Sequence, residues 1–267
     1  MSTKKLAIVG CGKLGTILAH ACRDGLLPDY TLVAVMGRTS ARAQALAQEC
    51  HCAACDTLPA LLALQPDYVA EAASAETVRT IGEAVLAAGA DLILLSIGAL
   101  ADEAFYTRLR DTAQAHGSHV RLASGAVGGF DVLRTITLMS RLPGATPLTA
   151  GIHGQKGPAS LQNTPLFQPS LLQAEAAIDV FTGNAQEAIQ VLPTKVNVAV
   201  ATALATAGPG NTQVTITSVP GMTGDDHCIT AETDGLRATI DIYSRNSEIA
   251  AWSVVSLLQN LASPIVF

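Results

Sequence analysis

A glycine-rich turn near the amino end constrains this chain more than any other feature. The apolar run Leu6–Val9 has the composition of a buried parallel strand. Gly10, Gly12 and Gly15 follow it in the spacing G-x-G-x-x-G, and an apolar helix is predicted next, over Leu14–Leu27. Such a turn suits a dinucleotide, because its glycines permit a tight turn, admit the pyrophosphate to the backbone and pack the helix on the strand. We therefore predict cofactor contacts at Gly10, Gly12, Lys13, Leu14 and Gly15.

The end of the second predicted strand, Tyr30–Met36, favours one dinucleotide over another. NAD-specific folds usually carry Asp or Glu here for the ribose 2′-hydroxyl, whereas this chain reads Gly37-Arg38-Thr39-Ser40. Arg38 can form a bidentate pair with a phosphate, and Thr39 and Ser40 can donate hydrogen bonds. We therefore place Arg38 and Thr39 in the cofactor site and predict NADP as the preferred cofactor, with NAD as the other choice. The competing interpretation makes Arg38 a solvated turn residue.

Composition excludes several classes of protein. The 267 residues suffice for one large or two modest domains. Although 49% of the residues are hydrophobic, no apolar run reaches the roughly 18 residues of a membrane span. The net charge of −6 gives no reason to expect a nucleic-acid partner. Lys4 and Lys5 lead directly into the first strand without a signal-peptide pattern, so we expect a cytoplasmic protein that contacts no membrane.

Three of the six cysteines and one histidine fall in one segment, Cys50-His51-Cys52 and Cys55. Thiolate and imidazole are zinc ligands, so a metal site is one interpretation. The segment also lies where the third strand is expected, and small apolar residues, cysteine included, suit a buried strand. We interpret the cysteines as reduced structural thiols of a cytosolic protein and predict no metal.

The first 125 residues alternate strands and helices, which indicates a doubly wound parallel sheet of the Rossmann type. The predicted strands are Lys5–Val9, Leu32–Met36, Cys52–Cys55, Tyr68–Glu71, Leu92–Ser96 and His119–Leu122. Small residues follow the fourth strand, at Ala72-Ala73-Ser74, and the fifth, at Leu95–Leu100. Ligands bind at the carboxyl ends of such strands, so Ala73 and Ser74 join the predicted cofactor site. Ordinary loop composition is the alternative.

The character of the sequence changes at the glycine-rich turn Ser124–Asp131. Beyond it the predicted elements are a helix over Val132–Arg141, β-like runs at Pro147–Ile152, Gln213–Val219, Cys228–Thr233 and Leu236–Tyr243, and a helical stretch over Ala185–Leu204. We predict an α/β protein with a Rossmann domain over residues 1–125 and an α+β substrate and oligomerisation domain over residues 126–267. The final helix, Ile249–Leu261, can pack back on the first domain.

Several segments together carry a family resemblance. They are Gly10–Gly15, Leu95–Leu100, Ser124–Asp131, Phe181–Ala188, Pro193–Ala199 and Asp226–Ile229. Their order and spacing resemble those of the L-aspartate dehydrogenases over nearly the whole chain. The resemblance implies NAD(P)-dependent oxidation of L-aspartate to iminoaspartate, which is hydrolysed to oxaloacetate and ammonia, and the reverse reductive amination. It also implies that His227 is the catalytic acid/base, and that the Ala126 amide and the Asn197 side chain contact the cofactor.

The chemistry of the residues agrees with that role. Imine hydrolysis near neutral pH needs a group that takes and returns a proton, and imidazole suits it. The residues alone leave His153 and His227 as equal candidates, and the resemblance favours His227. The candidates to bind a dicarboxylate are His153, Lys156, Lys195 and Arg245, with Lys156 best placed on a predicted loop. The chain departs from the family pattern at Gly37-Arg38, at Lys195, and in the short loop Ser244–Glu248.

Two other functions stay open from the sequence. One is another two-domain NADP reductase of the homoserine dehydrogenase or dihydrodipicolinate reductase kind, and the other is a non-catalytic NADP sensor. The low charge, the apolar last helix with Trp252 and the β-like runs of the second domain predict a homodimer formed through that domain.

Overall fold

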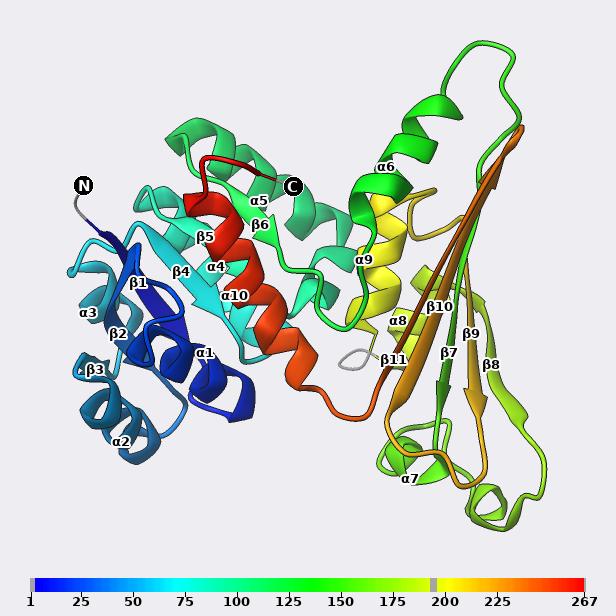
Figure 1. Cartoon of the computed structure of the whole chain (residues 1–267), viewed down its shortest axis with the longest axis horizontal. Helices are drawn as coiled ribbons and strands as arrows, with labels where there is room; N and C mark the ends of the chain where they lie inside the picture. Colours follow the sequence, from blue (N-terminus) through cyan, green and yellow to red (C-terminus); the bar gives the residue numbers. More distant parts are fainter. Residues whose placement is uncertain (1–2, 193–195, 267) are drawn as a thin grey trace. The chain divides into compact units, whose positions relative to one another are not determined.

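The computed structural model describes residues 3–192 and 196–266, which form two compact units (Figure 1). Unit 1 contains the chain up to Gly125 together with the segment from Glu248 onward, and unit 2 spans Ala126–Ser247. The carboxyl-terminal segment, which the sequence assigned to the second domain, therefore groups with unit 1. No helix of the described residues is long and apolar enough to cross a bilayer.

Unit 1 is built on a six-stranded parallel sheet in the order β3-β2-β1-β4-β5-β6, which confirms the predicted Rossmann class. Its strands are β1 (Lys4–Val9), β2 (Tyr30–Met36), β3 (Ala53–Cys55), β4 (Tyr68–Glu71), β5 (Asp91–Leu94) and β6 (Val120–Leu122). Its helices are α1 (Lys13–Arg23), α2 (Ser40–Cys50), α3 (Leu58–Leu62), α4 (Ala75–Ala87), α5 (Glu103–His116), α10 (Glu248–Ala262) and the 3₁₀ helix η1 (Ile97–Ala101). The strand order reverses between β1 and β4, and ligands of such sheets bind at that switch point.

Two glycines make the turn between β1 and α1 possible. Gly10 has φ +119°, and a Cβ there would collide with the backbone of Ala72. A Cβ on Gly15 would overlap the carbonyl oxygen of Gly10. The predicted roles of a tight turn and a close helix approach therefore have a direct steric cause.

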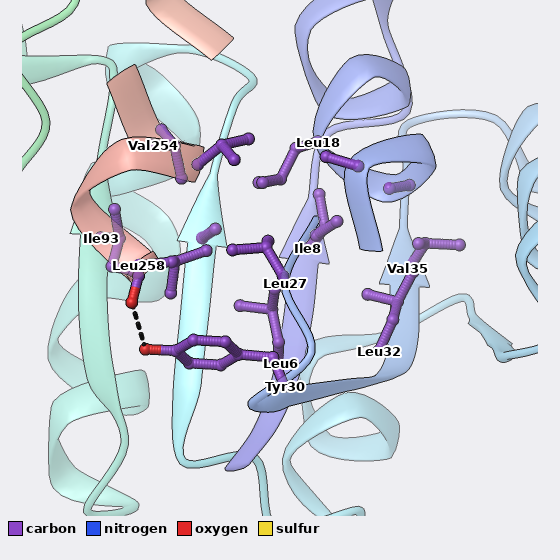
Figure 2. Packing of buried hydrophobic residues seen from close by; sticks show 14 of the residues in the cluster. Leu6, Ile8, Leu18, Leu27, Tyr30, Leu32, Val35, Ile93, Val254 and Leu258 are labelled. Atoms are coloured by element: carbon purple, nitrogen blue, oxygen red, sulfur yellow. Dashed lines mark hydrogen bonds between the residues drawn. The ribbon is translucent and has the colours of Figure 1, made fainter. Parts of the chain in front are cut away.

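The main core of unit 1 lies between the sheet, α1 and α10 (Figure 2). Val254 and Leu258 of α10 are fully buried in it, together with Leu6 and Ile8 of β1. The Tyr30 hydroxyl donates a hydrogen bond of 2.8 Å to the Leu258 carbonyl. Burying such side chains stabilises the fold by about 1.5–3 kcal/mol each, so the apolar face of the last helix is used within unit 1.

The cysteines of unit 1 are free and partly or fully buried. Burial raises the pKa of Cys22 to about 12 and that of Cys52 to about 11. Thiols held in this protonated form are poor nucleophiles and poor metal ligands. The segment Cys50–Cys55 forms the end of α2 and the edge strand β3, and no cluster of potential metal ligands occurs among the described residues.

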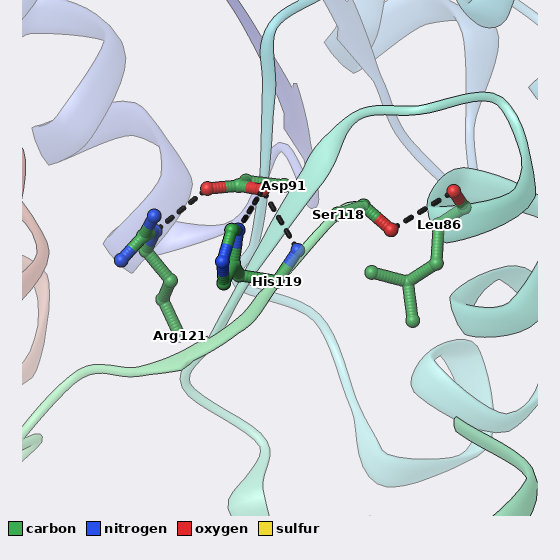
Figure 3. A network of polar contacts seen from close by, with 5 residues as sticks. All are labelled: Leu86, Asp91, Ser118, His119 and Arg121. Atoms are coloured by element: carbon green, nitrogen blue, oxygen red, sulfur yellow. Dashed lines mark hydrogen bonds and ion pairs between the residues drawn. The ribbon is translucent and has the colours of Figure 1, made fainter. Parts of the chain in front are cut away.

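Asp91 fixes the amino ends of β5 and β6 (Figure 3). Its carboxylate accepts hydrogen bonds from the His119 backbone N–H at 2.8 Å and from Arg121 Nε at 2.7 Å. His119 Nδ1 lies 3.1 Å from the same carboxylate. Ligands bind at the opposite, carboxyl ends of parallel strands, so we assign His119 and Arg121 a structural role.

Unit 2 is built on a five-stranded mixed sheet in the order β11-β10-β7-β9-β8. Its strands are β7 (Thr149–Lys156), β8 (Ile178–Asn184), β9 (Thr212–Ser218), β10 (Asp225–Thr233) and β11 (Leu236–Ser244). Its helices are α6 (Phe130–Met139), α7 (Pro158–Leu161), α8 (Ala185–Val191), α9 (Asn197–Ala205) and the 3₁₀ helix η2 (Pro169–Gln173). Helices α6 and α9 contact β10 and β7, respectively.

Unit 2 differs from the sequence expectation in two places. Strand β8 was not predicted, because its composition is mixed and it pairs only with β9, at one edge of the sheet. The helical stretch expected over Ala185–Leu204 is two helices, α8 and α9. A capping box starts α8: Glu187 N–H donates to Asn184 Oδ1 at 2.9 Å, and Asn184 N–H donates to the Glu187 carboxylate at 2.8 Å.

Candidate active site

A cleft opens in unit 1 at the carboxyl ends of β1, β2 and β4. It is lined by Gly10, Cys11, Gly12, Gly37, Arg38, Thr39, Arg42, Ala72, Ala73, Ser74 and Thr77. The structure thus brings together six of the residues predicted to bind a cofactor, from three segments of the chain. Cys11 packs against Gly37, where a Cβ would lie only 3.0 Å from the Cys11 sulfur.

Three helices begin at this cleft. Gly12 is the N-cap of α1, Thr39 of α2 and Ser74 of α4. Helix amino termini carry free N–H groups and a partial positive charge, so each favours an anion. The lining contains no acidic side chain. The cleft therefore has the electrostatics of a site for phosphates.

Two guanidinium groups add full charges at the β2 end of the cleft. Arg38 and Arg42 both line it, and neither has an ion-pair partner among the described residues. Sequence reasoning missed Arg42, although it lies only four residues after Arg38, in the first turn of α2. The Ser40 hydroxyl already donates a hydrogen bond of 2.7 Å to Asp56, whereas the Thr39 side chain makes no capping hydrogen bond to α2.

Three predicted cofactor residues have other surroundings. The Lys13 ammonium pairs with Glu248 at 3.0 Å, and the Leu14 side chain packs against the core cluster. Gly15 is buried beneath Gly10. None of the three lines the cleft, so their predicted cofactor contacts stay predictions.

A buried carboxyl group, Glu71, holds the loops after β4 and β5. It accepts hydrogen bonds from Ala73 N–H at 2.7 Å, Ser96 N–H at 3.0 Å and the Ser96 hydroxyl at 2.8 Å. Burial raises its pKa, and the donors act against that rise. Glu71 therefore fixes the position of Ala73 at the cleft, a role that its place at a strand end did not reveal.

A second pocket lies in unit 2, against one face of the mixed sheet. Its apolar wall is formed by Ile152, Val196, Val198, Ala199, Val214 and Ile216, and its polar members include Lys156 and His227. His227 is 6% exposed, and its Nδ1 has no hydrogen-bond partner among the described residues. Burial, and next the charge of Lys156, lowers its pKa to about 4, while Asp225 acts in the opposite direction. The imidazole is therefore neutral at physiological pH.

Strand register explains which polar groups meet there. Across β10 and β7, Asp225 lies opposite Lys156, and His227 lies opposite Gly154. Gly154 packs directly against the ring, since a Cβ there would be in van der Waals contact with His227 Nδ1, at 3.5 Å. The Lys156 ammonium is 3.3 Å from Asp225 Oδ1. Lys156 is thus the last residue of a strand and not, as expected, part of a loop.

The same register separates the two candidate histidines. His153 lies opposite Cys228, so it occupies the other face of the sheet from His227. There His153 Nε2 is 2.7 Å from the Thr217 hydroxyl, which donates to Asp179 at 2.5 Å. His153 therefore does not line the pocket, and His227 does.

The remaining predicted site residues belong to unit 2. Asn197 is the first residue of α9, and Ala126 is half-buried at the start of the unit. Their contacts with a cofactor stay predictions. Arg245 is exposed and lines neither pocket, and Lys195 lies outside the described residues.

A Rossmann sheet with an anion-binding cleft, joined to an α+β unit that carries a buried histidine, defines the class of two-domain nicotinamide-nucleotide dehydrogenases. Comparison with known proteins narrows this class. The model of the aspartate dehydrogenase C-terminal domain matches residues 145–261, and that of the homoserine dehydrogenase NAD-binding domain matches residues 10–123.

Full-length relatives give the family. The L-aspartate dehydrogenase of Methanospirillum hungatei is 31% identical over 269 residues, and that of Methanocaldococcus jannaschii is 29% identical over 268, each match covering 98% of both chains. The crystal structure of aspartate dehydrogenase from Thermotoga maritima superposes with a TM-score of 0.77 at 25% identity, over 99% of both chains. The chain belongs to the L-aspartate dehydrogenase family.

Proposed function

We propose that this protein catalyses the reversible, NADP-dependent oxidative deamination of L-aspartate to oxaloacetate and ammonia, with iminoaspartate as the intermediate. The observation that carries the proposal is the buried imidazole of His227, whose Nδ1 has no hydrogen-bond partner among the described residues, beside Lys156 in a chain of this family. Its products and substrates are small molecules, and the negative net charge gives no support to a nucleic-acid partner.

Residues of the chain supply binding and proton transfer. The nicotinamide, when bound, accepts the hydride of the substrate Cα–H bond. The neutral imidazole of His227 can take a proton from the water that attacks the imine, then return it to the departing amine. The carboxylates of a bound substrate favour the protonated imidazole. They therefore raise its pKa toward neutrality, where acid/base catalysis is most effective.

The preference for NADP over NAD rests on the charges of the cleft. Arg38 follows β2 and Arg42 lies in the first turn of α2, and both line the cleft next to the position at which Rossmann folds contact the ribose 2′ substituent. Two unpaired guanidinium groups and no carboxylate favour a 2′-phosphate. The pyrophosphate is expected at Gly10 and Gly12, before the amino terminus of α1.

We also propose a cytoplasmic homodimer. Six free thiols suit a reducing compartment. The last helix buries its apolar face in unit 1, which weakens one ground for a dimer, but Leu138, Leu142 and Tyr243 of unit 2 are more than half exposed. Light scattering at micromolar concentration should give at least twice the chain mass of 27.5 kDa. A chain that stays monomeric contradicts this assembly.

An initial-rate assay tests the function. L-Aspartate is supplied with NADP or NAD, and homoserine and dihydrodipicolinate are tested beside it with the matching nucleotides. Turnover of aspartate with a higher kcat/KM for NADP supports the proposal. Turnover of either other substrate instead identifies a different reductase, and NADP binding without turnover identifies a sensor.

A further inference from the structure

An ion pair lies beside the histidine of the unit 2 pocket, and one of its members, Lys156, lines that pocket. Lys156, at the end of β7, and Asp225, at the start of β10, form an ion pair beside His227, and all three point to the helix-covered face of the sheet. Lys156 is 18% exposed and Asp225 is 45% exposed as side chains. The pair is therefore reachable from solvent, although one side of it is enclosed.

The hydrogen bonding of these groups is incomplete. Asp225 Oδ1 is buried and accepts no hydrogen bond from the part of the chain that the structure describes, since its 3.3 Å contact with Lys156 does not have hydrogen-bond geometry. His227 Nδ1, on a residue that is 6% exposed, also lacks a partner. A buried polar atom without a partner is destabilising by about 1–3 kcal/mol. Two such atoms beside one ammonium group indicate that a ligand completes the site.

The surroundings make these charges effective. The other side chains that approach the pocket from α9, Val198 and Ala199, are apolar, as are Ile152 and Ile216 of the sheet. Electrostatic interactions are stronger in such a low-dielectric setting than in water. Asp226 points to the opposite face of the sheet, with Asp241, so it does not compete for a ligand here.

An amino acid carries a carboxylate and an amino group, which are complementary to the ammonium group of Lys156 and the carboxylate of Asp225. We propose, resting on the function proposed above, that the Lys156–Asp225 pair recognises the substrate. The Lys156 ammonium binds a carboxylate, and the Asp225 carboxylate binds the amino nitrogen beside His227. Without substrate the two residues pair with each other. Substrate binding exchanges this one pair for two pairs that have hydrogen-bond geometry.

Reductive amination tests the roles of Lys156 and Asp225 separately, because the carboxylates belong to oxaloacetate and the nitrogen to ammonia. Initial rates are measured with oxaloacetate, ammonium and NADPH. Lys156→Met should raise the KM for oxaloacetate about 10- to 100-fold, the loss of a charge-assisted hydrogen bond, with little change in the KM for ammonium. Asp225→Asn should raise the KM for ammonium by a similar factor and leave that for oxaloacetate unchanged or lower. Lys156→Arg, which keeps the cation, should recover part of the loss.

The pH profile gives a second readout. The charge of Lys156 lowers the pKa of His227, and that of Asp225 raises it. The acidic limb of kcat/KM should therefore move to higher pH in Lys156→Met and to lower pH in Asp225→Asn. Glu232→Gln and Arg237→Met remove a matched ion pair on the same two-stranded edge, 3.9 Å apart and exposed, and should change neither KM nor the profile.

Several outcomes overturn the inference. One such outcome is that the KM values for oxaloacetate and ammonium rise together in both variants, or rise in neither. Lys156 and Asp225 then do not bind the carboxylate and the nitrogen separately. NADPH affinity and melting temperature identify a variant that has simply unfolded. If Lys156→Met is unfolded, the KM of Lys156→Arg for oxaloacetate tests the role of Lys156 in its place. A wild-type protein that turns over neither oxaloacetate nor aspartate defeats the proposed function instead. The role of the pair is then tested by calorimetric titration with L-aspartate. Binding by the wild type that both variants lose supports the inference. No binding by the wild type, or equal binding by the variants, overturns it.

Discussion

The nucleotide cleft of unit 1 and the pocket of unit 2 recognise their ligands by different means. The cleft is made mainly of backbone, helix amino termini and small residues, and only its Arg38 and Arg42 bring full charges. The pocket depends on side chains: strand pairing brings Lys156 and His227 into its lining, with Asp225 paired to Lys156 on the same face of the sheet. A site formed by main-chain groups tolerates many side-chain substitutions but few changes of backbone conformation. Side-chain sites depend on a few groups whose loss removes the chemistry.

The largest effect is expected from His227→Ala, which tests whether the two sites are separable. Loss of an acid/base group should lower kcat by about 10²–10⁴-fold. Affinity for NADPH should stay unchanged, because the cleft belongs to unit 1. Fluorescence titration with NADPH and steady-state rates check both parts. His153→Ala, on the opposite face of the sheet, is the matched control, and a larger loss in that variant would transfer the catalytic role to His153.

The pH dependence of stability is the next largest effect, and it is specific to the pocket. The pKa of His227 is lowered to about 4 from 6.5, so the unfolded chain binds a proton at a higher pH than the folded chain. The contribution of this group to stability is fully present above pH 6.5 and is lost as the pH falls toward 4. That difference amounts to roughly 3 kcal/mol.

Urea unfolding of wild type and His227→Gln between pH 7 and pH 4 measures this contribution. The variant has no titrating ring, so its stability should fall less steeply with acid. Parallel curves for the two proteins would mean that His227 titrates normally in the folded state.

Cofactor choice should respond to Arg38, the strongest charge contact expected in the cleft. Arg38→Asp should lower kcat/KM for NADP by roughly 1.5–3 kcal/mol, about 10- to 150-fold, because a charge-assisted hydrogen bond is lost. NAD has no 2′-phosphate, so its kcat/KM should change much less. Arg79→Asp, on the exposed side of α4 and outside the cleft lining, controls for the change in net charge. Equal losses with both nucleotides would refute the 2′-phosphate assignment.

Arg42→Ala sharpens the same comparison with the smallest expected effect. If Arg42 adds a second contact to the 2′-phosphate, kcat/KM for NADP should fall by about 1 kcal/mol, roughly fivefold. The ratio of NADP to NAD efficiency is the quantity to compare. An unchanged ratio would leave Arg38 as the sole discriminating cation of the cleft.

The cleft could be predicted closely because its information is local. Gly10, Gly12 and Gly15 act through sterics over a few residues, and Arg38 and Thr39 follow their strand directly. Lys13 and Leu14 were predicted from the same motif, and their cofactor contacts stay predictions; their side chains contact Glu248 and the core. A motif determines the backbone conformation of a loop, whereas the contacts of each side chain depend on the neighbours that the tertiary structure places around it.

The sequence by itself determined the Rossmann class, the glycine turn and the set of candidate histidines and lysines, because strand and helix periodicity and glycine sterics operate at short range. Only the tertiary structure decided that α10 completes the core of unit 1, that Glu71 ties two strand ends together, and that His227 shares a pocket with Lys156 while His153 does not. The physical reason is register. In a sheet, alternate residues face opposite sides, and the partner that lies across from each residue is set by pairing between segments far apart in the chain.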